Sequence, residues 1–117
     1  MRVAVDNSLL LLIKSSMLGE GEPVLGEKLL HAFLSQLLES GSIPARIICM
    51  NLGIFLTTEE SPGMDLMKQF ESQGSEILSC GTCLEYYKRK DRLLLGKPTN
   101  MRDTVNALLN FDKVLQP

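Results

Sequence analysis

The sequence predicts a three-layer α/β/α sandwich, in which helices cover both faces of a mainly parallel sheet of about five strands. The apolar segment from Leu9 to Ile13 is continuous rather than alternating, which is typical of a strand buried on both faces. Turn residues and then a helical pattern follow it, and this succession recurs along the 117 residues. Because no repeat or linker interrupts the succession, we expect a single domain over residues 1–117, with residues 1–7 as an irregular N-terminal extension.

The first helix is predicted between Pro23 and Ser40. Proline suits the first turn of a helix, apolar residues recur at helical spacing from Leu25 to Leu38, and Gly41 stands where a C-cap glycine belongs. The turn that precedes this helix contains Ser15, Ser16, Gly19 and Gly21.

Two more strands and a second helix are predicted in the middle of the chain. Ile47 to Met50 form an apolar run after Pro44, and turn residues follow from Asn51 to Thr58. A serine and a proline then begin a helix over residues 61–74. Glu76 to Ser79 are expected to form a short third strand.

The last third of the chain is less regular. Within Tyr87 to Pro98, the segment Leu93 to Leu95 either ends a helix or begins a strand. Val114 and Leu115 suit a closing strand. One face of a final helix is described by Met101, Val105, Leu108 and Leu109.

Composition excludes several classes of protein. A net charge of -2 and a pI near 5.4 give no basic footprint for nucleic acid or an anionic membrane. The longest apolar run, Leu9 to Ile13, falls far short of the roughly 20 residues of a membrane span. Three cysteines are an odd number, which argues against a secreted disulfide framework. We therefore expect a cytoplasmic protein without nucleic-acid or membrane partners.

The candidate chemistry gathers at one edge of the predicted sheet. In sheets of this class, ligands bind beyond the carboxyl ends of the strands. The turns Ser15 to Gly21, Asn51 to Thr58 and Cys80 to Cys83 each follow a predicted strand. We therefore expect them to lie along the same edge.

The motif Cys80-Gly81-Thr82-Cys83 is the most informative feature of the sequence. It follows the apolar Ile77 and Leu78 and precedes a segment that can continue as a helix. Thiols near a helix N-terminus have a lowered pKa, because the helix dipole stabilises the thiolate. A run of basic residues from Lys88 to Arg92 follows, and it either forms a solvated face or docks an acidic partner.

Several readings of the two thiols compete. A dithiol oxidoreductase would cycle Cys80 and Cys83 through a disulfide, and an inert pair would belong to a non-catalytic oligomeric binding module. Zinc needs four ligands, and the other soft donors are Cys49, expected inside a strand, and His31, expected on the outer face of the first helix. A persulfide carrier needs one nucleophilic cysteine and an assisting thiol, without a metal or cofactor.

The thiol motif also carries a family resemblance. The segment from Leu78 to Tyr87 resembles the motif of the DsrE-like sulfurtransferase family, in particular the DsrE-like domain of YedF-type selenium-metabolism proteins. Further segments agree in order along the chain from about Leu9: Gly19-Glu20-Gly21, Leu25-Gly26, Ala32-Phe33-Leu34, Asn51, Leu56-Thr57-Thr58-Glu59, Thr99-Asn100-Met101 and Asp112-Lys113-Val114.

The resemblance implies an α/β/α sandwich that forms homo-oligomers, dimers or trimers, and acts in sulfur or selenium relay. Cys80 matches the sulfur-carrying cysteine, and Cys83 would be the assisting thiol. The expected partners are proteins that donate and accept sulfur. YedF-type proteins often carry a TusA-like domain with a Cys-Pro motif, which this sequence lacks, so a TusA-like partner would be a separate chain. The residues expected to shape the pocket are Ser15, Ser16, Gly19, Asn51, Gly81 and Thr82.

Overall fold

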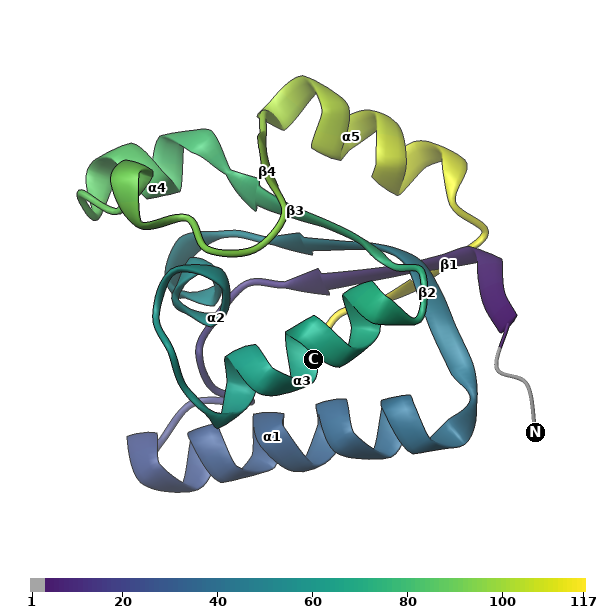
Figure 1. Cartoon of the computed structure of the whole chain (residues 1–117), viewed down its shortest axis with the longest axis horizontal. Helices are drawn as coiled ribbons and strands as arrows, with labels where there is room; N and C mark the ends of the chain where they lie inside the picture. The colour runs from purple at the N-terminus through teal and green to yellow at the C-terminus, as the bar shows by residue number, and fades with distance from the viewer. Residues whose placement is uncertain (1–3) are drawn as a thin grey trace.

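Five parallel strands form one sheet in the order β4-β3-β2-β1-β5 (Figure 1). The computed structural model describes residues 4–117. The strands are β1 (Ala4–Ile13), β2 (Ser42–Cys49), β3 (Glu76–Cys80), β4 (Lys97–Thr99) and β5 (Lys113–Leu115). The helices are α1 (Pro23–Ser40), α2 (Phe55–Thr58), α3 (Pro62–Ser72), α4 (Gly81–Tyr86) and α5 (Met101–Asn110), with 3-10 turns η1 (Asn51–Ile54) and η2 (Lys90–Arg92).

Helices cover both faces of this sheet, as the sequence predicted (Figure 1). α1 and α3 lie on one face, where Leu34 and Phe70 pack in the same cluster as Ile13 and Ile47. α5 lies on the other face, and α4 lies at the carboxyl end of β3 (Figure 1). On the α5 face, a smaller cluster combines Leu10, Leu12 and Ile48 of the strands with Ala107 of α5. The continuous apolar run in β1 is therefore explained, because alternate residues of the run enter opposite cores.

The ends of α1 and α3 confirm the predicted helix signals. α1 ends at Gly41, whose φ of 83° is the left-handed conformation that glycine adopts without strain. α3 begins at Ser61, whose hydroxyl accepts a hydrogen bond from the N–H of Met64 at 3.2 Å. None of the helices between residues 4 and 117 combines the length and the apolar character that crossing a bilayer requires.

The first two strands are longer than the sequence predicted. Residues 4–7, expected to be irregular, belong to β1, while residues 1–3 lie outside the described part of the chain. Likewise, Pro44 lies inside β2 instead of before it. It pairs with Asp6, next to the point where the register between β1 and β2 shifts. At an irregular point of the ladder, proline is tolerated although it has no N–H to donate.

Two segments expected to be turns or ambiguous have definite structures. The Asn51 to Thr58 segment forms η1 and α2 rather than an open turn. The Leu93 to Leu95 segment neither ends a helix nor begins a strand; it connects η2 to β4, and the N–H of Leu94 donates to the carbonyl of Thr57 at 3.0 Å. A backbone hydrogen bond to α2 thus takes the place of regular structure.

α5 buries a different face from the apolar one that predicted it. Thr104 and Ala107 are buried toward the sheet, whereas Met101, Val105 and Leu109 are exposed. Small side chains on the buried face suit close contact between a helix and a sheet. The apolar stripe of α5, defined here as Met101, Val105, Leu108 and Leu109, therefore faces away from the core of the chain.

Candidate functional site

The two thiols of the C-x-x-C motif lie where β3 gives way to α4. Cys80 is the last residue of β3 and the N-cap of α4, and Cys83 lies in the first turn of that helix. Cys80 is buried, with 8% of its surface exposed, whereas Cys83 is half-buried, and both are free thiols. Ser79, the preceding residue, makes a 2.7 Å hydrogen bond with the hydroxyl of Thr57 in α2. Because side chains alternate along a strand, Cys80 projects from the opposite face.

Asn51 joins the thiols from the neighbouring strand. It directly follows Met50 at the carboxyl end of β2, and β2 pairs with β3 through Cys49 and Ser79. The backbone N–H of Asn51 donates to the Cys83 sulfur at 3.1 Å. Parallel pairing of adjacent strands thus brings together two of the expected turns, as predicted from the order of strands and turns.

The immediate surroundings of Cys83 raise its pKa above the ordinary value for a thiol. Burial is the largest cause, followed by the hydrogen bond with Cys80, and the negative charge of Cys80 acts in the same direction. The N–H of Asn51 acts oppositely, because it stabilises the thiolate. The expected lowering of this pKa at the helix start is therefore wrong for Cys83, because burial and then the neighbouring Cys80 sulfur raise it.

Cys49, the third cysteine, takes no part in this arrangement. It is the last residue of β2 and is fully buried. Burial raises the pKa of its thiol to about 12. Cys49 thus lies inside a strand, as expected from the sequence, and a thiol with this pKa is protonated at neutral pH.

An aromatic cluster next to the thiols was missed by the sequence analysis. The Tyr87 hydroxyl donates to the side-chain oxygen of Asn51 at 3.0 Å. The Tyr87 ring meets Phe55 edge-on, with ring centroids 5.6 Å apart. One signal was available in the sequence: Tyr87 comes four residues after Cys83, and this spacing places two side chains on the same face of a helix.

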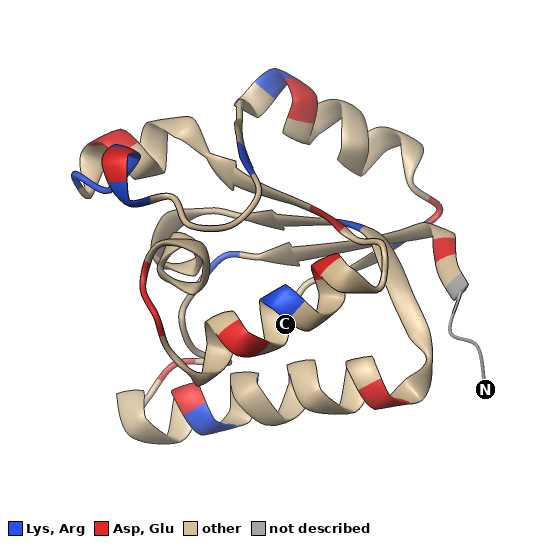
Figure 2. Cartoon of the chain, viewed as in Figure 1, with Lys and Arg blue, Asp and Glu red and all other residues tan. Residues whose placement is uncertain are grey.

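Within the basic run from Lys88 to Arg92, Arg89 packs against this aromatic cluster. The guanidinium of Arg89 lies 4.0 Å from the centre of the Phe55 ring and 3.5 Å from a carboxylate oxygen of Glu59. Its side chain is only 16% exposed. Around it, acidic and basic residues alternate at the corner formed by α4 and η2 (Figure 2). Arg89 therefore belongs to the packing around Phe55 rather than to a uniform solvated face.

The remaining expected pocket residues lie in three different places. Gly81 and Thr82 are the first residues of α4, between the two cysteines. The Ser15 hydroxyl accepts from the N–H of Met17 at 3.2 Å, within its own turn. Gly19 is exposed, with a φ of 78°. Ser16 lines a groove on the α1 side of the sheet.

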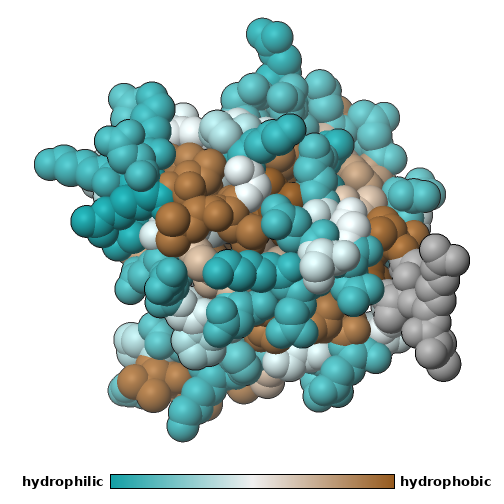
Figure 3. All heavy atoms as spheres, viewed as in Figure 1, coloured by the Kyte–Doolittle hydropathy of each residue, from teal (hydrophilic) through white to brown (hydrophobic). Residues whose placement is uncertain are grey.

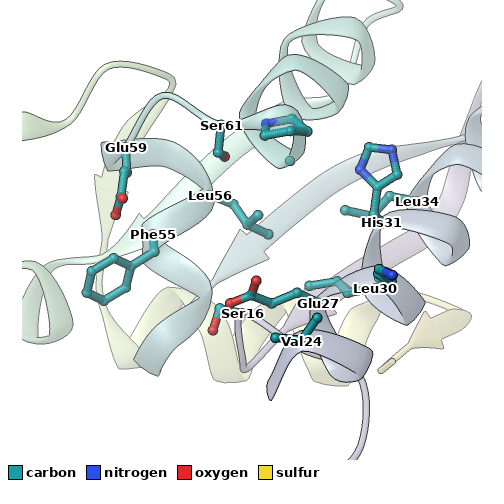
Figure 4. Close-up of a pocket in the computed structure, with 13 residues that line it drawn as sticks. Ser16, Val24, Glu27, Leu30, His31, Leu34, Phe55, Leu56, Glu59 and Ser61 are labelled. Carbon is teal, nitrogen blue, oxygen red and sulfur yellow. The ribbon is translucent and has the colours of Figure 1, made fainter. Parts of the chain in front are cut away.

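This groove has a volume of about 630 Å³ and lies between α1, α2 and the start of α3 (Figure 4). Its apolar lining includes Leu30, Leu34 and Leu56, and its charged side chains include Glu27 and Glu59. Phe55 lines one end of the groove and also contacts Tyr87. A single ring thus connects the groove to the aromatic cluster beside Cys83.

No metal centre accompanies the thiols in the described residues. Between residues 4 and 117, no group of three or more His, Cys, Asp or Glu side chains is arranged to hold a metal ion. The chemical groups present are two neighbouring thiols, the backbone N–H of Asn51 and a phenol that donates to the Asn51 side chain.

The chain matches no protein-family model, and no curated protein matches it. Solved structures do resemble it over almost its full length. The ychN protein from E. coli aligns with 96% of this chain and 100% of its own, at 17% identity and a TM-score of 0.65. A protein of unknown function from Methanobacterium thermoautotrophicum aligns over the same shares, at 15% identity and a TM-score of 0.68.

A third likeness is to a conserved protein of unknown function from Bacteroides thetaiotaomicron. It covers 94% of this chain and 95% of the other, at 15% identity and a TM-score of 0.67. At these identities the three likenesses show a shared fold. They agree with the DsrE-like fold expected from the sequence, with its parallel five-stranded sheet flanked by helices.

Proposed function

We propose that this chain is a sulfur relay protein of the DsrE-like kind, related to the YedF-type proteins, which carries a persulfide on Cys80 and passes it to a partner. The observation that carries the proposal is the pairing of two unlike thiols at the carboxyl edge of a parallel sheet. Cys80 ends its strand beside a second thiol whose pKa is raised partly by the charge on Cys80. A negative charge on Cys80 therefore favours the protonated form of Cys83.

This difference suits transfer of a terminal sulfur atom. The Cys80 thiolate attacks the outer sulfur of a donor persulfide, a new S–S bond forms, and the donor's S–S bond breaks. Cys83 gives its proton to the departing donor thiolate. In the second half, the Cys83 thiolate takes the proton of an acceptor thiol, the acceptor attacks the outer sulfur, and Cys80 leaves as the thiolate. The cycle has no net oxidation, so it needs no further reductant.

The pKa of Cys83 is expected to fall when Cys80 forms the persulfide bond. The negative charge of Cys80 is one cause of the raised pKa of Cys83. Once Cys80 has formed the persulfide bond, that charge is gone, while the N–H of Asn51 still faces the Cys83 sulfur. The pKa of Cys83 then falls, and its proton becomes available to the leaving group.

The same pair of thiols supports one alternative. Because Cys80 and Cys83 stand at the N-cap and in the first turn of α4 and Cys80 acts on the pKa of Cys83, the pair also suits exchange with a bound disulfide in the manner of a dithiol oxidoreductase. In that cycle a Cys80–Cys83 disulfide forms, and two electrons pass to the substrate disulfide. The two functions differ in the product that remains on the protein, which is a persulfide in one and an internal disulfide in the other.

The proposal includes assembly into homo-oligomers and exchange of sulfur with protein partners, a TusA-like chain among them. Exposed apolar surface supports both kinds of contact: brown atoms gather over the segment between η2 and β4 and at the start of α1 (Figure 3). Leu94 and Val24 are among the exposed apolar residues there. Selenium is an alternative cargo, and a reducing cytoplasm is the compartment that keeps such thiols free.

Intact-protein mass spectrometry after incubation with a sulfane-sulfur donor tests the proposed function. We expect the wild type to gain one sulfur atom that a reductant removes, Cys83→Ser to retain the gain, and Cys80→Ser to lose it. Cys49→Ala is the matched control and should load like the wild type, because its thiol is fully buried. A loss of two hydrogen masses without added sulfur would favour the oxidoreductase, and no change in any variant would favour a non-catalytic module.

A further inference from the structure

Asn51 adopts an unusual backbone conformation at the thiols. Its φ is 51°, in the left-handed region that few residues other than glycine and asparagine occupy without cost. In this conformation its N–H meets the Cys83 sulfur at 3.1 Å. The direction of this hydrogen bond thus depends on how firmly the Asn51 turn is held.

Tyr87 holds the turn through the side chain of the same asparagine. Its hydroxyl donates to the Asn51 side-chain oxygen at 3.0 Å, so Asn51 contacts α4 and the following residue through two separate bonds. The Tyr87 ring is held edge-on between Phe55, at 5.6 Å, and Tyr86, at 5.1 Å. Phe55 is in turn covered by Arg89. The phenol therefore projects from a packed cluster rather than from a free surface.

We propose that Tyr87 and Asn51 are positioning residues that keep the Asn51 N–H directed at the Cys83 sulfur, so that Cys83 can carry negative charge after Cys80 has formed its persulfide bond. This role rests on the proposed function. It assigns to Tyr87, whose hydroxyl bonds to Asn51, a part in the proton transfer that acts through Asn51.

The groups that face Cys83 determine its apparent pKa, which a pH profile of its reaction rate measures. They are the Cys80 thiol from β3, the N–H of Asn51 from η1 and the backbone N–H of Cys83 itself from α4. Arg89 and Glu59 lie beyond the Phe55 ring, on the far side of the aromatic cluster. Replacing Cys80 with serine removes the titrating neighbour. In that background, the Asn51 N–H still faces the Cys83 sulfur and stabilises its thiolate.

The experiment measures the rate of Cys83 alkylation by iodoacetamide against pH in the Cys80→Ser background. Adding Tyr87→Phe removes only the hydroxyl, and we expect it to raise the apparent pKa of Cys83 by about half a unit to one unit. The sign follows from the loss of a donor to the thiolate. The fraction of thiolate at pH 7 then falls by about three- to tenfold.

Two further variants make the test specific. Asn51→Gly keeps the N–H and accepts the positive φ but lacks the side-chain oxygen, so it should shift the pKa like Tyr87→Phe. The double variant should shift it no further, because both changes break the same bond. Tyr86→Phe is the matched control: Tyr86, the last residue of α4, is exposed, and the variant keeps the ring that meets Tyr87 while removing a hydroxyl, so it should leave the profile unchanged.

An unchanged Cys83 profile in Tyr87→Phe, with the fold intact by circular dichroism, would overturn the positioning role. Additive shifts in the double variant would also overturn it. Because this measurement uses no sulfur donor, its outcome is independent of the relay. A shifted profile in a protein that never loads sulfur would leave the positioning role standing and refute the relay.

Discussion

Cys80 and Cys83 differ in what surrounds each sulfur atom, although only two residues separate them. Cys83 receives a hydrogen bond from Asn51 and faces Cys80, whereas Cys80 is buried at the end of a strand. The sequence identified both thiols and Asn51. Apart from the spacing of Tyr87 from Cys83, it gave no sign of the contacts of Tyr87, Phe55 and Arg89, because those contacts join η1, α2 and the residues after α4 in space. Spacing along the chain reports only on contacts within one element.

Cys49 gives the clearest prediction at the residue scale. Its pKa is raised to about 12 in the folded protein, against 9.0 for an ordinary thiol. Its contribution to stability is therefore complete below about pH 9 and is lost as the pH rises toward 12, because the unfolded chain releases the proton first. We expect the free energy of unfolding of the wild type to fall more steeply above pH 9 than that of Cys49→Ala, by about 1.4 kcal/mol for each pH unit.

Urea unfolding of both proteins between pH 7 and 10.5 checks this prediction. The comparison uses the slopes, since Cys49→Ala also removes packing from the core and lowers stability at every pH. Parallel curves for the two proteins would show that Cys49 titrates normally and is not buried as described.

The elements that the sequence predicted best are those with strong local signals at both ends. α1 and α3 begin at a proline and end at or near a glycine, and their apolar spacing is regular. The segment before β4 was ambiguous, since its course depends on a hydrogen bond to α2, which is far away in the sequence. The order of the strands could not be predicted either, because no local pattern records which strands become neighbours.

Gly96 marks the point at which that ambiguous segment enters the sheet. Its φ is 75°, and a Cβ atom there would overlap the carbonyl oxygen of Ile77 in β3. Gly19 has nearly the same φ, 78°, but open space around it. We expect Gly19→Ala to cost about 1 kcal/mol from the backbone alone, and Gly96→Ala to cost at least about 3 kcal/mol, because backbone overlap adds to that cost. Urea unfolding measures both, and equal losses would contradict the packing described for β4.

At the scale of the whole molecule, the apolar stripe of α5 is a surface that the folded chain leaves uncovered. Leu109, at one end of the stripe, is 77% exposed, and Met101, at the other end, is 58% exposed. Such surface on a small domain is typical of an interface between subunits. The proposal of homo-oligomers therefore predicts that this stripe lies in the contact between subunits.

Light scattering coupled to size exclusion tests this assignment. We expect the wild type to elute as an oligomer and Leu109→Glu to dissociate at the same concentration, because a charge would be buried in the contact. Asn106→Glu introduces the same charge on the same helix outside the stripe and should leave the oligomer intact. A monomeric wild type would refute the assembly, and an intact Leu109→Glu oligomer would place the contact elsewhere.

The path of α5 also has a consequence for how the sheet is completed. This helix starts beside one edge strand, β4, and delivers the chain to the opposite edge, where Leu9 pairs with Lys113. The first and last strands thus lie side by side, and one edge of β1 remains unpaired until the last strand is added. A ribosome releases the sequence of β1 first and that of β5 last. During synthesis, β1 is therefore the strand whose second neighbour is made last. Until then its open edge can pair with another copy of the chain, which is a route to aggregation.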